Sequence, residues 1–402
     1  MHRFWIATAM STLATPALAD EVKLKPLIDA RLRYENVDQA PFASKAEAIA
    51  ARVRAGVEAK TKAFTVLVEA EGTLAISEKY NSGLNGKSAF PIVADPQNIE
   101  LNRAQVQLLA IPKAVITLGR QRINLDDQRF VGSVGWRDNE QTFDAVRAEW
   151  SGIKNVKADI TYAWSNRTIW GVDGFGARQQ TASGDNIFAN LSYKHKLGTL
   201  VGFAYLVDQD EAAVSGFRLS SQTYGARFAG SAPLSKAAKL NYVASYARQS
   251  DYHNNPISYG ADYWLGELAV EAKGFKLLGG YEVLGSSSGV ALTSFQTPLA
   301  TLHKFNGWAD KFLTTPANGL RDAYVTLGYA KPKLGKLTAL TAQATWHDFR
   351  SDRLGQNYGN EINLLLSAKH KRTTFILKYA DYNAKAFATD TRKFWASVEW
   401  AL

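Results

Sequence analysis

The feature that most constrains this chain is a two-residue alternation of apolar and polar side chains. In the first such stretch, residues 28, 30, 32 and 34 are Ile, Ala, Leu and Tyr, while 29, 31, 33 and 35 are Asp, Arg, Arg and Glu. The pattern recurs over 49–58 and over 393–402. Because side chains point alternately to the two sides of a strand, each stretch fits a strand with one apolar face, whereas helical spacing would scatter the same residues around a cylinder.

The connections between these stretches predict how the strands are arranged. Eighteen strands are expected, at 27–35, 48–59, 63–76, 99–110, 114–122, 143–150, 156–165, 186–195, 199–207, 221–230, 237–249, 261–272, 275–284, 321–330, 337–349, 360–369, 373–382 and 393–402. The connections alternate strictly between long loops, such as 285–320, and tight turns, such as Lys273-Gly274. A soluble sandwich also alternates along its strands, but it has no reason to sort its connections in this way. We therefore predict an all-β transmembrane antiparallel barrel of about 18 strands (16–18), with short periplasmic turns, long extracellular loops and both termini at the turn side.

The N-terminus predicts export from the cytoplasm. A positive start at Met1–Arg3 precedes a short apolar core at Phe4–Leu13 and the small-residue site Ala17-Leu18-Ala19. This is the pattern of a secretory signal peptide, and its apolar core is too short to anchor the chain in a bilayer. We expect residues 1–19 to be cleaved and 20–402 to form a single barrel domain in the bacterial outer membrane. The chain has no cysteine, which excludes disulfides, thiolate metal sites and cysteine nucleophiles.

The faces opposite the apolar ones are expected to line a lumen and to carry the function. Their candidate selectivity residues are Arg31, Arg33, Arg52, Arg54, Glu69, Glu71, Arg103 and Arg147. A hairpin closing over 36–47 would place the first two arginines beside the next two. A guanidinium stays charged and binds a carboxylate through two hydrogen bonds, so such a wall suits carboxylated or phosphorylated solutes. A ladder of structural ion pairs explains the same residues equally well, and both interpretations stay open.

The stretch 118–150 is the most distinctive part of the chain. It contains Gly119-Arg120-Gln121-Arg122, then Asp126-Asp127-Gln128-Arg129-Phe130-Val131-Gly132, and Trp136-Arg137 through Thr142-Phe143-Asp144. Between its flanking strands it has too little apolar repetition to form a strand. Such a loop can fold into the lumen as a constriction, where its charges find partners, or it can form a solvated extracellular cap.

These motifs resemble the alginate-export porins of the bacterial outer membrane. The resemblance rests on Gly119-Arg120-Gln121, Arg129-Phe130-Val131-Gly132 and Trp136-Arg137 through Asp144, and extends loosely over the mature chain. It implies an eighteen-stranded barrel whose electropositive, arginine-lined constriction conducts an anionic polysaccharide outward. By motif position the constriction residues would be Arg120, Arg129, Arg137 and Asp144, with Arg122 beside them. The chain is shorter than expected for a dedicated alginate exporter and its inward charges are more balanced, so the substrate transfers less well than the fold.

Three functions are compatible with such a barrel. The first is a passive anion-favouring channel, for export of an acidic polysaccharide such as alginate or for uptake of small anionic solutes. The second is a barrel enzyme, which we do not expect: the mature histidines, His195, His253, His303, His347 and His370, fall on separate turns, loops and strands. Only His347 adjoins an acid, Asp348, and adjacent strand residues face opposite sides. The third is a gated porin with loop 285–320 as a lid; a mobile or surface-exposed loop explains that segment equally well.

The expected partners follow from the channel interpretation. They are outer-membrane lipid, an anionic polysaccharide or small anionic solute, and periplasmic export proteins. Nucleic acid is excluded, because the net charge of +10 is not gathered in any basic segment. No cofactor is expected, and Asp126-Asp127 is only a weak candidate for Ca²⁺.

Overall fold

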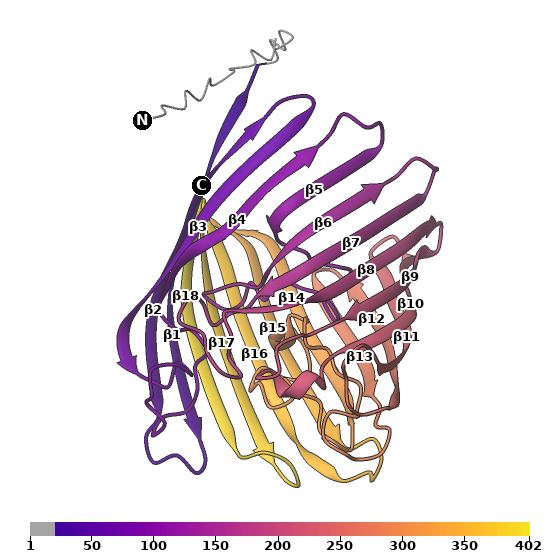
Figure 1. The fold of residues 1–402 in the computed structure, drawn as a ribbon. Helices are drawn as coiled ribbons and strands as arrows, with labels where there is room; N and C mark the ends of the chain where they lie inside the picture. Colours follow the sequence, from indigo (N-terminus) through magenta and orange to yellow (C-terminus); the bar gives the residue numbers. More distant parts are fainter. Residues whose placement is uncertain (1–20) are drawn as a thin grey trace, which may run out of the picture.

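The computed structural model describes residues 21–402 as one closed antiparallel sheet of 18 strands. Each strand pairs with its neighbours in the sequence, and β1 (Lys23–Gln39) pairs with β18 (Thr391–Ala401) to close the barrel (Figure 1). The predicted fold and strand number are therefore confirmed. The predicted signal peptide, residues 1–19, lies outside the described residues.

The strand bounds follow the predicted ranges closely. The remaining strands are β2 (Ala46–Lys60), β3 (Phe64–Lys79), β4 (Asn98–Leu108), β5 (Ala114–Gln121), β6 (Thr142–Trp150), β7 (Val156–Arg167), β8 (Thr181–His195), β9 (Gly198–Val207), β10 (Ser221–Ser235), β11 (Ala238–Asp251), β12 (Gly260–Ala272), β13 (Phe275–Leu284), β14 (Leu320–Leu334), β15 (Leu337–Arg350), β16 (Asn357–His370) and β17 (Thr373–Ala384). Two single-turn 3₁₀ helices, η1 (Ser215–Phe217) and η2 (Leu302–Lys304), lie in loops. Several strands are longer than predicted, because hairpin pairing continues past the apolar band, as in the β1–β2 ladder out to Val37 opposite Ala46.

The two rims differ in the length of their connections. Turns of two to five residues, such as 61–63, 151–155 and 273–274, join the strands at one rim. Loops join them at the other rim, and the two that matter below are 122–141 and 285–319. Because β1 runs into loop 40–45 and β18 comes out of loop 385–390, the chain enters and leaves the barrel at the turn rim.

Burial along the strands is the inverse of that in a soluble protein. On β1, Leu32 is 48% exposed, whereas Arg31 and Arg33 are 5% and 2% exposed. The apolar faces therefore point outward, as a wall in contact with lipid requires, and the charged faces point into the barrel. Among residues 21–402, no helix is long and apolar enough to cross a membrane.

Candidate functional site

Two long loops fold into the lumen and bind each other there. We call 122–141 and 285–319 the inner loops. The backbone N–H of Gly132 donates to the carbonyl of Leu299 at 2.9 Å, and the N–H of Thr301 donates to the carbonyl of Gln128 at 3.1 Å. The Gln141 side chain also donates to the Leu299 carbonyl, at 3.0 Å. The segment that the sequence left undecided between a constriction and an external cap is thus part of the barrel interior.

Aromatic packing fixes the first inner loop to the wall. The ring of Phe130 lies 5.1 Å from Phe203 on β9 and 5.3 Å from Tyr263 on β12, measured between ring centroids. It also contacts Phe295 of the second inner loop, at 5.9 Å. A single loop aromatic therefore joins two strands and the partner loop in one buried apolar cluster.

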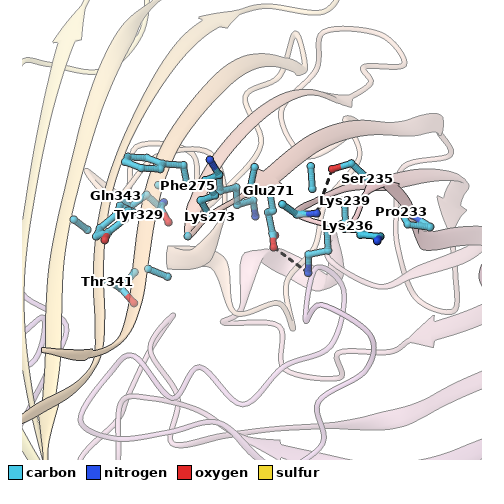
Figure 2. Close-up of a pocket in the computed structure, with 18 residues that line it drawn as sticks. Pro233, Ser235, Lys236, Lys239, Glu271, Lys273, Phe275, Tyr329, Thr341 and Gln343 are labelled. Atoms are coloured by element: carbon cyan, nitrogen blue, oxygen red, sulfur yellow. Dashed lines mark hydrogen bonds and ion pairs between the residues drawn. The ribbon is translucent and has the colours of Figure 1, made fainter.

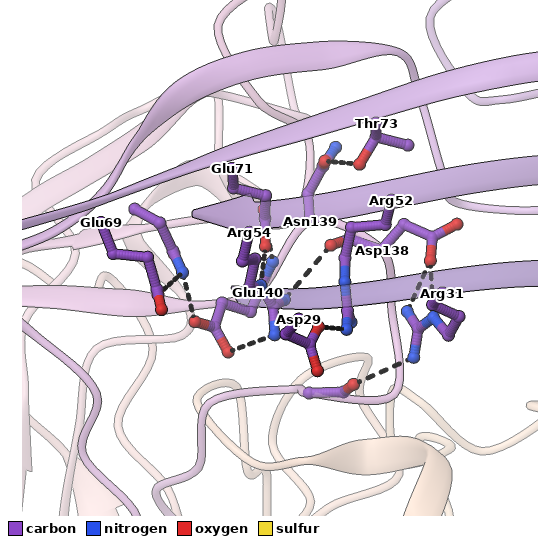
Figure 3. Close-up of polar contacts among 12 residues, drawn as sticks. Asp29, Arg31, Arg52, Arg54, Glu69, Glu71, Thr73, Asp138, Asn139 and Glu140 are labelled. Atoms are coloured by element: carbon purple, nitrogen blue, oxygen red, sulfur yellow. Dashed lines mark hydrogen bonds and ion pairs between the residues drawn. The ribbon is translucent and has the colours of Figure 1, made fainter. Parts of the chain in front are cut away.

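Ion pairs fix the same loop to the opposite wall (Figure 3). Arg31 Nη2 lies 2.6 Å from Asp138 Oδ1, and Asp138 is fully buried. Arg54 of β2 pairs with Glu71 of β3 and lies 3.4 Å from Glu140 of the loop. Arg33 lies 2.5 Å from Asp95, which accepts the backbone N–H of Asp138. The predicted cross-hairpin placement of these arginines is therefore observed, and their partners include loop carboxylates.

Most of the predicted selectivity arginines are paired with carboxylates. Arg52 pairs with Asp29, Arg103 with Glu69, Arg122 with Glu69 and Glu140, Arg129 with Glu282, Arg137 with Asp95 and Asp310, and Arg147 with Asp159. A buried pair that loses one partner leaves an uncompensated charge, so these contacts hold the loops and wall in one arrangement. Only Arg31, Arg52 and Arg54 of the predicted arginines also border the main cavity.

Two predicted constriction residues lie away from the lumen. Arg120 and Asp144 pair with each other at 2.8 Å across β5 and β6. Leu118 lies two residues before Arg120 on β5, and Val146 lies two residues after Asp144 on β6; both are exposed on the outer face. Phe143, next to Asp144, is fully buried on the inner face. By alternation the Arg120–Asp144 pair belongs to the outer face, which corrects the expectation drawn from motif position.

The inner loops divide the lumen into two spaces. A cavity of about 880 Å³ occupies the turn side and is bordered by Asp29, Lys276 and Glu399 among others. A pocket of about 250 Å³ lies on the loop side. His303 borders both spaces. We define the constriction as Trp136, Arg137, His303, Asp310 and Lys378, since these residues separate the two spaces.

Lys378 is the central basic side chain of the constriction. Its Nζ lies 2.6 Å from His303 Nε2 and 3.9 and 3.7 Å from the ring centroids of Trp136 and Trp308. An ammonium only donates, so Nε2 accepts and the other ring nitrogen, Nδ1, donates to Asp310 at 2.8 Å. Lys378 thus keeps two donors beyond this bond. Further buried donors at the cavity wall, Trp136 Nε1 and Asn363 Nδ2, have no partner among the described residues.

The titratable loop groups of the constriction are held in fixed charge states. Burial, followed by the charge of Lys378, lowers the pKa of His303 to about 3. Burial opposes ionisation of Asp310, but Lys393 at 2.7 Å, His303 and Arg137 together hold the pKa of that carboxyl well below its usual value. At neutral pH the constriction therefore contains a neutral imidazole and an ionised carboxylate.

Acid should loosen the inner loops through His303. The pKa of its ring rises when the loop undocks, so the undocked state binds the proton more readily below pH 6.5, and docking weakens as pH falls from there toward 3. Each pH unit below 6.5 lowers the free energy of docking by up to about 1.4 kcal/mol. Asp310 is ionised in both states over most of this window, and its lowered pKa adds to the loosening only as the pH approaches the ordinary value of 3.8. Amide hydrogen exchange of 285–319 at pH 7, 5.5 and 4 should show increasing exposure, and His303→Gln should flatten that dependence; an unchanged dependence in the variant would contradict this assignment.

Other predicted residues have ordinary partners. Asp126 accepts from Asn190 at 2.9 Å, and Asp127 pairs with Arg227 at 2.9 Å, so the two carboxylates point to different partners. Among the described residues, no group of three or more candidate ligands could hold a metal ion. His347 bonds Asp322 across the strand pair at 2.9 Å, and Asp348 is not its partner.

Sequence reasoning did not bring the constriction residues together. Trp136, His303, Asp310 and Lys378 come from both inner loops and from β17, and their meeting depends on how the loops dock. The long loops are expected to be extracellular, but the one that contains His303 folds inward and buries the ring. The one available signal was Trp136-Arg137 in the motif cluster.

Comparisons with known proteins agree with this architecture. A family model described as alginate export matches residues 28–255. The solved outer-membrane porin OccK9 (OpdG) of Pseudomonas aeruginosa superimposes with a TM-score of 0.72 at 14% identity, covering 94% of this chain and 98% of that one. OccAB4 of Acinetobacter baumannii also gives 0.72 at 14%, covering 96% and 99%, and OpdQ of Pseudomonas aeruginosa gives 0.67 at 15%, covering 94% and 98%. No curated protein sequence matches at a significant level.

Proposed function

The chain belongs to the alginate export family and forms a porin-like channel in the bacterial outer membrane, and from that premise we propose that it conducts carboxylated sugars, the units of acidic polysaccharides. Transport is passive, the constriction sets the selectivity, and the protein is not an enzyme. Lipid surrounds the barrel, and the solute is its main partner.

The single observation that carries the proposal is the donor-rich, tryptophan-lined environment of Lys378. A sugar acid offers a carboxylate and a ring with an apolar face. Lys378 has spare donors for the carboxylate, and Trp136 and Trp308 provide apolar ring surface on either side of the ammonium. Charge-assisted hydrogen bonds are stronger than neutral ones and strengthen further away from bulk water.

The charges around the main cavity support modest rather than extreme anion preference. Basic residues Arg31, Arg52, Arg54, Arg227, Lys276, Lys304 and Lys378 face acidic residues Asp29, Asp127, Glu267, Glu282, Asp322 and Glu399. Several of these cations are already neutralised by ion pairs, as are most of the predicted arginines. Selectivity is therefore assigned to Lys378 and its surroundings, and the arginines act mainly by holding the inner loops.

Current block by defined sugars tests this function. Purified protein in a planar bilayer should show brief closures when oligouronates of three to six units are added, and the closures should become more frequent as the concentration rises. A concentration of about 1 mM suits the weak affinity that is expected of a transport site. Neutral oligosaccharides of the same length are the matched control and should block at least about tenfold more weakly, because they lack the partner of Lys378. Equal block by both sugar classes, or none by either, would overturn the proposal.

A further inference from the structure

The turn rim carries a ring of lysines. Each of the eight tight turns contains at least one lysine, and none contains Asp or Glu. The lysines are Lys62, Lys113, Lys154, Lys196, Lys236, Lys273, Lys336 and Lys371, and all are exposed. The loops at the opposite rim mix both signs almost evenly. The excess positive charge of the chain is therefore concentrated on one side of the barrel.

The charge of this ring is largely uncompensated. Among residues 21–402, the seven turn lysines from Lys113 to Lys371 form no ion pair. Carboxylates near the rim pair instead with strand lysines: Glu271 with Lys239 at 2.9 Å, and Glu149 with Lys157 at 2.6 Å. These strand pairs leave the field of the turn lysines in place.

The ring is continuous with the solute path. A pocket of about 540 Å³ at this rim is bordered by Lys236, Lys239, Lys273 and Lys276, with Glu271 as its one acidic residue (Figure 2). Lys276 also borders the main cavity, so a ligand held in this pocket is already at the entrance of the lumen.

We propose that this lysine collar captures acidic polysaccharide chains from the periplasm and feeds them into the lumen, so that the channel is loaded for export. The inference rests on the proposed function and adds the surface at which an acidic chain first binds, the lysines of the turn rim. A single exposed lysine binds a carboxylate weakly. A ring of them creates a common field extending about a Debye length, ~10 Å at 0.1 M salt, and a chain with repeated carboxylates meets several lysines at once.

One-sided block experiments test the collar. Because the chain has no cysteine, Ala237→Cys in a turn reports the orientation of each inserted channel through its reaction with a membrane-impermeant thiol reagent. Sodium polyuronate added to the turn side at 0.1 M salt should be captured at least about tenfold faster than polyuronate added to the loop side, and the difference should vanish near 1 M salt, as expected for electrostatic steering.

Matched variants identify the residues responsible. Lys236→Gln/Lys273→Gln/Lys336→Gln should lower the turn-side capture rate about fivefold, with little change in the duration of each block, whereas the same three positions as arginine should retain it. Lys45→Gln/Arg353→Gln/Lys385→Gln, at exposed sites on the loop rim, is the control and should leave turn-side capture unchanged.

The outcomes separate this inference from the proposed function. Block that is equal from both sides and insensitive to the turn variants would overturn the collar while leaving the carboxylated-sugar channel intact. Absence of block by oligouronates and by polyuronate would overturn both. Capture from the turn side that falls with the glutamine variants but not with the arginine variants supports the collar.

Discussion

Replacing Lys378 with glutamine should weaken oligouronate block by about 10- to 100-fold, the equivalent of one charged hydrogen bond. The ammonium is the one cation that borders the main cavity, contacts two tryptophan rings and has donors to spare. Glutamine keeps a donor for His303 but removes the charge. The measurement is the dissociation constant of a trimeric uronate from single-channel block at fixed ionic strength.

Two further variants make this result specific. Lys385→Gln removes one lysine from an exposed loop position and should leave the dissociation constant unchanged. Trp308→Leu keeps Lys378 but removes one of the two tryptophan rings beside it. It should therefore weaken the binding of sugar acids more than the binding of simple carboxylates. If Lys378→Gln binds the uronate as tightly as the parent protein does, the constriction is not the selectivity site.

Replacing Arg129 with leucine should lower the free energy of unfolding by about 3–5 kcal/mol, because Glu282 is left as a buried charge without a cation. The same replacement should raise the single-channel conductance. Arg129 Nε lies 2.6 Å from Glu282, and the guanidinium also donates to Thr297 and Asn306 of the second inner loop. Losing it releases the first inner loop from β13 and from its partner loop together. Urea unfolding and conductance of the same preparations measure both effects.

The double variant Arg129→Leu/Glu282→Leu isolates the pair. It should recover part of the lost stability, because both charges are gone while Tyr263 Oη and Asn306 Nδ2 lose the acceptor that Glu282 provides. Arg350→Leu is the matched control: Arg350 pairs with Asp348 at 2.8 Å on the surface, where such a pair contributes about 0–1 kcal/mol. A loss of stability from Arg350→Leu as large as that from Arg129→Leu would contradict the role assigned to burial.

The barrel was predictable because its determinants are local. Alternation defines each strand face, and the sorting of connections into turns and loops defines the rims, so neither requires knowledge of distant contacts. The placement of Arg31 beside Arg52 followed from the same logic, since a hairpin fixes the register of its two strands. Arg120 shows the reverse case: counting by twos from Leu118 places it on the outer face, and the motif resemblance gave the wrong side.

The constriction was not predictable because it forms only when distant segments come together. Lys378 meets His303 and Trp136 only after two loops have folded into the lumen and bound each other. The collar contributes one lysine per turn, so the sequence contains no basic segment that a linear scan would detect. Barrel closure collects these lysines at one rim, and the same closure separates them from the acidic residues of the loops.

The central claim is that this channel favours anions through its constriction, and the reversal potential across a salt gradient tests it most directly. With purified protein in a planar bilayer and a tenfold KCl gradient, the account predicts a reversal potential of anion-selective sign that moves toward zero in Lys378→Gln. A reversal potential of cation-selective sign, or one that Lys378→Gln does not change, would contradict the account.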